Sequence, residues 1–171
     1  MDKVVAPLMR VAAFKGLTSE QFRDIARHAK KLKFLRGDVI TRVGTPGDGA
    51  FVIASGPAEC VASPDGQNEM LAPGALVGEM AMLIEHDYQA TVVARDWVFC
   101  LKITRAAMHA QMRADPSLAE HFQRRVTARL LQVAEELRRI DGILATRDAA
   151  TPSAAAAPTA AVHAEGERLS G

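Results

Sequence analysis

Short apolar runs separated by turn residues dominate the middle of this sequence. Between Leu32 and Ile103 the runs have the length of β-strands, and glycine, proline, serine or aspartate interrupts them about every ten residues. Turn residues at such intervals are typical of an all-β sandwich or barrel, because each tight turn joins two antiparallel strands. The runs that we predict as strands are residues 32–35, 39–43, 50–55, 58–63, 67–72, 90–94 and 98–103.

Two helices are predicted before the strands. Residues 4–13 form an amphipathic stretch that Gly16 ends, and Thr18 and Gln21 then have the spacing of a capping box that opens a second helix. Residues 1–36 hold nine Lys and Arg against three Asp and Glu. A basic cluster follows the second helix, at Lys30, Lys31, Lys33 and Arg36. We interpret this cluster as a solvated helix end, because aromatic residues do not alternate with the charges as in a nucleic-acid stacking platform. A nucleic-acid contact is the alternative.

A heptad pattern of apolar residues runs through the last long helix. Thr104 caps a short predicted helix, and Asp115 then caps a helix over residues 116–147. Residues spaced by four and three form one seam in it: Val126, Leu130, Val133, Leu137, Ile140 and Leu144. The seam packs either on this chain's own barrel or on a second copy. We favour a parallel homodimer through residues 126–144, because an uncovered seam would expose a long apolar surface.

The stretch from Pro73 to Arg95, the cassette segment, has the features of an anion cradle. Gly78 allows the backbone to approach a ligand without a side-chain clash. Glu79, Met80 and Ala81 follow at the first turn of a short predicted helix, where free N–H groups attract an anion. Taken alone, Glu79 is better explained as a charge that complements the helix dipole.

In context, the cassette segment resembles the phosphate-binding cassette of the cyclic nucleotide-binding domain family. The sequence GEMAML at residues 78–83, followed after seven residues by TVVA at 91–94, carries the resemblance. In that family the cassette glutamate binds the ribose 2′-hydroxyl and backbone amides bind the cyclic phosphate, which implies these roles for Glu79 and for residues 79–81. Similar glycine-rich strand corners extend the resemblance over roughly residues 14–122. It implies a mainly β fold, an antiparallel jelly roll with flanking helices and a long C-terminal helix, through which the family's transcription factors dimerise.

One position departs from the family pattern. Counted from Glu79, the arginine that pairs with the phosphate falls on Tyr88, which Gln89 and Ala90 follow. We therefore expect weak or altered binding of cyclic AMP, cyclic GMP or another small anion, and no other cofactor. The predicted ligand-binding residues are Gly78, Glu79, Met80, Ala81, Tyr88, Gln89 and Ala90. Two functions are open: a regulatory module that senses a nucleotide and signals to an unidentified downstream protein, or a degenerate domain that serves as an interaction or dimerisation scaffold.

Catalysis and metal binding are not expected. The histidines are scattered, without the His-x-His pair and nearby carboxylate of a metal-dependent jelly-roll enzyme. The sequence also lacks a nucleophile elbow, a P-loop and a dinucleotide fingerprint. We therefore predict a non-enzymatic protein.

The organisation that we expect is N-terminal helices at 1–30, a jelly roll at 31–103, C-terminal helices at 104–147 and a disordered Ala- and Pro-rich tail at 148–171. A tail of this length has no room for a helix-turn-helix domain, so direct DNA binding is not expected. No apolar stretch approaches the ~20 residues of a membrane span, and we expect a cytoplasmic protein without membrane contact. Cys60 and Cys100 lie in strand runs and are predicted as buried free thiols.

Overall fold

The computed structural model describes residues 2–62 and 68–149. The chain divides into two compact units, residues 1–131 and 132–171. The sheets and the candidate site lie in the first unit, and most of the predicted tail, from residue 150 onward, lies outside the described residues. Within the described ranges, no helix has the length and apolar character needed to cross a membrane.

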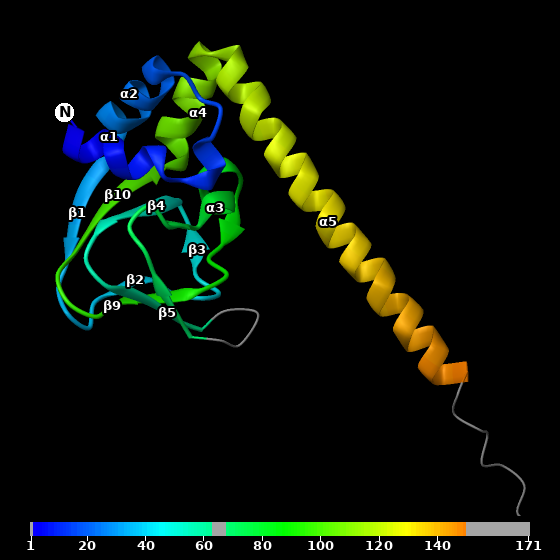
Figure 1. Ribbon diagram of the computed structural model, residues 1–171. Helices are drawn as coiled ribbons and strands as arrows, with labels where there is room; N and C mark the ends of the chain where they lie inside the picture. Colours follow the sequence, from blue (N-terminus) through cyan, green and yellow to red (C-terminus); the bar gives the residue numbers. More distant parts are fainter. Residues whose placement is uncertain (1, 63–67, 150–171) are drawn as a thin grey trace, which may run out of the picture. The chain divides into compact units, whose positions relative to one another are not determined.

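Two four-stranded antiparallel sheets and one short ribbon form the β part (Figure 1). The first sheet has the order β1-β10-β4-β7, the second β2-β9-β5-β6, and the ribbon pairs β3 with β8. This antiparallel roll with flanking helices confirms the predicted fold class. The strands are β1 (Lys30–Phe34), β2 (Val39–Thr41), β3 (Pro46–Gly47), β4 (Gly49–Ser55), β5 (Ala58–Ala62), β6 (Glu69–Leu71), β7 (Leu76–Val77), β8 (His86–Asp87), β9 (Thr91–Ala94) and β10 (Val98–Thr104).

All seven runs that the apolar pattern predicted are strands, with ends that differ by at most two residues. The pattern missed β3, β7 and β8, each of two residues. A two-residue strand has no measurable alternation, so its existence depends on the partner that it pairs with. The ribbon of β3 and β8 places His86 opposite Gly47, which brings the end of the cassette helix beside the 44–49 loop.

The helices are α1 (Asp2–Met9), the 3₁₀ turn η1 (Ala12–Phe14), α2 (Ser19–His28), α3 (Glu79–Leu83), α4 (Arg105–Ala114) and α5 (Pro116–Ala149). In Figure 1, α1, α2 and α4 lie together at one end of the strands. The capping box is confirmed: the Thr18 hydroxyl accepts from the Gln21 amide at 3.2 Å, and the Gln21 side chain accepts from the Thr18 amide at 2.9 Å. Thr104 caps α4 and Asp115 accepts from the first amides of α5, as predicted.

The first helix is shorter than the predicted 4–13 span. Helix α1 ends at Met9, and the chain tightens through bonds from the Arg10 amide to Pro7 and from the Val11 amide to Leu8. This tightening leads into η1 and places Leu8, Val11 and Phe14 together in the core. Burial of these side chains therefore overrides the simple helical period.

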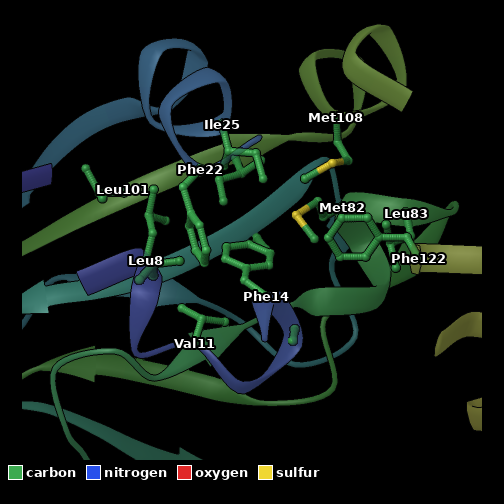
Figure 2. Packing of buried hydrophobic residues seen from close by; sticks show 14 of the residues in the cluster. Leu8, Val11, Phe14, Phe22, Ile25, Met82, Leu83, Leu101, Met108 and Phe122 are labelled. Atoms are coloured by element: carbon green, nitrogen blue, oxygen red, sulfur yellow. The ribbon is translucent and has the colours of Figure 1, made fainter. Parts of the chain in front are cut away.

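Two apolar clusters hold the first unit together. The first joins the N-terminal helices to α3, α4 and the beginning of α5; Phe14 makes edge-to-face contacts with Phe22 and Phe122 at centroid distances of 6.5 and 5.9 Å (Figure 2). The second lies inside the roll and includes Tyr88. Cys60 and Cys100 are both buried in this second cluster and neither forms a disulfide, as predicted. Since Met82 and Leu83 of α3 belong to the first cluster, the cassette helix is anchored to α4 and α5.

Candidate functional site

Gly78 turns the chain into the cassette helix. Its φ of +78° lies in the left-handed region, which a residue with a Cβ adopts only at a cost. Helix α3 then buries Ala81, Met82 and Leu83. Glu79 and Met80, at the first turn, are partly exposed. The backbone geometry that the cassette pattern predicted is therefore present.

The side chain of Tyr88 lies next to Gly78. Its side chain is only 7% exposed, and its ring packs near Phe51, with centroids 6.2 Å apart. A Cβ built on Gly78 would lie 2.6 Å from Tyr88 Cε1, and one on Gly47 would lie 3.3 Å from the same atom. The ring is thus wedged between two glycines that leave room for it.

The Tyr88 hydroxyl is also engaged within the chain. It donates to the Gly49 carbonyl oxygen at 2.9 Å, and the Asp48 Oδ1 atom lies 3.4 Å away. Burial, and then the charge of Asp48, raise the pKa of Tyr88 above its usual value, so the phenol is neutral. Its single donated proton is therefore committed to a backbone carbonyl.

Lys102, a cation near Tyr88, forms an ion pair with Asp48. The Lys102 Nζ atom lies 2.7 Å from one Asp48 oxygen and 2.8 Å from the other. The hydrogen bond from Lys102 is the largest of the effects that lower the pKa of Asp48. Lys102 is therefore already neutralised.

Glu79 makes an ion pair with the long helix. The Glu79 Oε1 atom accepts from Arg125 Nε at 2.8 Å, and the two side chains are 30% and 37% exposed. Arg125 lies on α5, within the first unit. The carboxylate that the resemblance assigns to the ribose hydroxyl therefore already holds a cation, and Arg125 is a site residue that sequence analysis did not select.

Arg105, at the beginning of α4, holds the C-terminal end of the cassette helix α3 through hydrogen bonds. Its Nη1 atom donates to the carbonyl oxygens of Gly47 at 2.9 Å, Ile84 at 3.0 Å and Ala81 at 3.2 Å. These contacts tie the end of α3 to the 44–49 loop. Arg105 was also missed from the sequence, because nothing near it in the chain indicates three distant carbonyl partners.

The remaining predicted site residues lie less centrally. Gln89 is exposed, and its side-chain amide donates to the Asp87 carbonyl at 3.1 Å. Ala90 is partly buried, and its carbonyl accepts from the Thr41 hydroxyl at 2.9 Å. The structure therefore brings Gly78, Glu79 and Tyr88 together, and Gln89 bonds to its own loop. Among the described residues, no group of three or more His, Cys, Asp or Glu side chains could hold a metal ion.

Comparison with known proteins agrees with the family resemblance that the cassette segment indicates. The family model described as "Cyclic nucleotide-binding domain" matches residues 31–115. A cyclic nucleotide-gated potassium channel of Mesorhizobium japonicum is 32% identical over 114 residues, which cover 67% of this chain and 31% of the channel. This chain therefore spans about a third of that relative's length.

Solved structures share the fold. The N-terminal domain of a transcriptional regulator from Streptomyces coelicolor superposes with a TM-score of 0.64 at 27% identity, covering 77% of this chain and 94% of that one. The catabolite activator protein of Thermus thermophilus gives a TM-score of 0.58 at 27% identity, covering 75% of this chain and 62% of the other. The similarity extends over the roll and its helices.

Proposed function

The chain belongs to the cyclic nucleotide-binding domain family, and from this premise we propose that it is a regulatory module with weak or altered affinity for cyclic nucleotides. Domains of this family regulate rather than catalyse. The proteins similar to this chain include an ion channel, a transcriptional regulator and a catabolite activator protein. These proteins share the cyclic nucleotide-binding domain, but the process that the domain regulates differs among them.

The burial of Tyr88 is the observation that carries the proposal, together with the residue count that places Tyr88 where the family has its phosphate-binding arginine. A guanidinium gives a phosphate two charge-assisted hydrogen bonds, whereas a phenol offers one neutral donor, and here the Gly49 carbonyl takes that donor. Losing one partner of a buried charge pair costs about 2–5 kcal/mol, which corresponds to roughly 30-fold to several thousand-fold in affinity.

The pairing of Glu79 with Arg125 supports a second, smaller loss. A ribose hydroxyl would have to compete with the guanidinium for Glu79 Oε1. Partly exposed ion pairs contribute about 1 kcal/mol or less, so this competition lowers affinity by no more than about fivefold. A ligand could therefore displace Arg125, which favours weak or altered binding over complete loss.

Calorimetry with cyclic AMP and cyclic GMP tests the proposal. Tyr88→Arg should raise affinity by about 30-fold or more, because it restores the charged pair with the phosphate. Tyr88→Gln serves as the matched control, since it removes the ring without adding charge, and it should not recover affinity. Submicromolar binding by the unchanged protein would contradict the proposal.

Dimerisation through α5 is the second part of the proposal. Leu130, Val133, Leu137 and Ile140 of the predicted seam are exposed, Leu137 by 57%. Val126, at its beginning, packs partly against the first core cluster, and the side chain of Leu144 lies outside the described residues. A second copy would cover this apolar stripe.

Light scattering on two matched variants tests the dimer. Leu137→Lys places a charge in the seam and should give a monomer. Leu131→Lys changes an even more exposed leucine beside the seam, 66% exposed, and should leave the dimer intact. A monomeric unchanged protein, or equal effects of the two variants, would contradict a dimer through residues 126–144.

The second candidate function is a protein-interaction or dimerisation scaffold, and the two internal contacts of the cassette favour it. Tyr88 and Glu79 both bond within the chain. For a scaffold, neither the unchanged protein nor Tyr88→Arg should be stabilised thermally by any nucleotide. Ligands that bind only the folded state raise the melting temperature, so a shift specific to one nucleotide favours the regulatory module.

A further inference from the structure

A groove of about 500 Å³ lies between α1 and the first sheet. Its walls include Pro7 of α1, Arg10 just after that helix, Lys31 of β1, Ser55 of β4 and Phe99 of β10. Figure 1 shows this side of the roll, where β1 lies beside β10 and next to α1. The volume is that of a site for a few side chains rather than a single ion.

Two exposed aromatic rings lie on this surface: Phe99 lines the groove, and Trp97 precedes it by two residues. Trp97 is 54% exposed and Phe99 is 48% exposed. The strand register places Lys33 directly opposite Phe99, and the Lys33 Nζ atom lies 3.1 Å from the centre of the Trp97 ring. Leu35, directly after the end of β1, is also exposed. Contiguous apolar side chains of this size in water mark an interaction surface.

The charged residues that line the groove are basic. Within residues 2–62 and 68–149, Arg10, Lys31 and Lys33 make no ion pair with a carboxylate. The described residues that line the groove include no Asp or Glu. Asp96, next to the aromatic end, accepts a hydrogen bond from the Trp97 amide. The groove therefore presents unpaired positive charge to a partner.

Protection of a sheet edge explains part of this surface. Strand β1 is at the edge of its sheet, and lysines on an edge strand discourage pairing with other chains. That role accounts for the lysines of β1. It does not account for Trp97 and Phe99, since exposed aromatic rings promote association rather than prevent it.

We propose that this groove binds an acidic peptide segment of a partner protein, with an apolar side chain beside Phe99 and carboxylates on Arg10, Lys31 and Lys33. A concave surface with adjacent aromatic rings and three cations fits an extended peptide, whose side chains enter pockets while its charges meet the rim. A bilayer would leave the groove itself empty. A nucleic acid would require a longer track of phosphate contacts than three cations supply.

Trp97 is the only tryptophan of the chain, so its fluorescence reports binding at this surface. The full chain is titrated with a set of short peptides rich in Glu and Asp, each with one central Phe, Leu or Ile. The same peptides with Gln and Asn in place of the acids are the controls. Acidic peptides should shift the Trp97 emission to shorter wavelength, and salt should weaken their binding because the charges are exposed.

Matched variants locate the site. Lys31→Glu combined with Lys33→Glu should lower affinity for the acidic peptides by about tenfold or more, which corresponds to at least about 1.4 kcal/mol. Phe99→Ser should also weaken these peptides, because each carries an apolar centre that lies beside Phe99. Arg23→Glu reverses an exposed charge on α2 and should have no effect. Labelled peptides, followed by anisotropy, give the affinities independently of Trp97.

Four results would overturn the proposal. Neutral and acidic peptides could bind equally, or none of them could bind. The charge-reversed variant could bind as tightly as the unchanged chain. Vesicles of phosphatidylcholine and phosphatidylglycerol, or oligothymidylate, could shift Trp97 where the peptides do not, which would assign the surface to a membrane or a nucleic acid instead.

Discussion

A double-mutant cycle between Gly78 and Tyr88 tests whether the tyrosine ring fills the cassette. Gly78→Ala adds one methyl group at a left-handed position, φ +78°, and places it 2.6 Å from Tyr88 Cε1. Gly44→Ala is the matched control, because Gly44 has φ +74° and a Cβ there would meet nothing within 4 Å. The two substitutions therefore share the backbone cost and differ mainly in the contact with the ring, although a Cβ on Gly78 would also lie 3.2 Å from the Gly49 carbonyl oxygen.

The magnitudes follow from these two terms. The left-handed backbone costs a residue with a Cβ about 1–2 kcal/mol, and overpacking against the ring adds about 1–3 kcal/mol. Gly78→Ala should therefore lower the free energy of unfolding by about 2–5 kcal/mol, and Gly44→Ala by about 1–2 kcal/mol. In a Tyr88→Val background the ring is absent, so Gly78→Ala should cost only the backbone term of about 1–2 kcal/mol.

Urea denaturation of the single and double variants measures the cycle. We expect a coupling of about 1–3 kcal/mol between Gly78→Ala and Tyr88→Val, and close to zero between Gly44→Ala and Tyr88→Val. Equal costs of Gly78→Ala in both backgrounds would refute the reasoning. The ring would then lie away from Gly78, and the phosphate position would be open.

Three further predictions concern the surroundings of the site and the core. Arg105→Met removes the hydrogen-bond donor shared by three carbonyl oxygens. It should lower the free energy of unfolding by about 1–3 kcal/mol and speed hydrogen exchange in α3. Unchanged exchange would contradict the role of Arg105 in positioning α3. Hydrogen bonds, first of all from Gln21, lower the pKa of Asp115 from 3.8 to about 2, so its stabilising effect is complete above pH 3.8 and is lost as the pH falls towards 2. In Asp115→Asn, the melting temperature should therefore fall less between pH 4 and pH 2 than in the unchanged protein. An equal fall in both proteins would show that other carboxylates cause the acid sensitivity. Burial raises the pKa of Cys100 to about 12, so its thiol should resist a thiol reagent in the folded chain, and rapid labelling would indicate local opening.

Local structure was predictable from the sequence where neighbouring residues decide it. The capping box of Thr18 and Gln21 and the cap at Thr104 involve residues three positions apart, and both are present. The seven longer strands follow from apolar runs and turn residues, since a half-buried strand and a tight turn each have a composition of their own.

Structure that depends on distant partners was not predictable in this way. The two-residue strands β3 and β8 exist because Pro46 and Asp87 are brought opposite each other. Helix α1 ends at Met9 because Val11 and Phe14 enter a core that includes Phe122, far along the chain. In both cases the tertiary contact, and not the local propensity, decides the backbone.

The same distinction, between what neighbouring residues decide and what distant residues decide, applies to the candidate site. Residue type and spacing were enough to predict a turn at Gly78 followed by Glu79 in the first turn of a short helix, and both are present. The hydrogen bond from the Tyr88 hydroxyl to Gly49, 39 residues away, and the ion pair of Arg125 with Glu79, 46 residues away, depend on the tertiary fold. The direction of a side chain depends on which surfaces pack around it, and those surfaces come together only when the roll and its helices have formed.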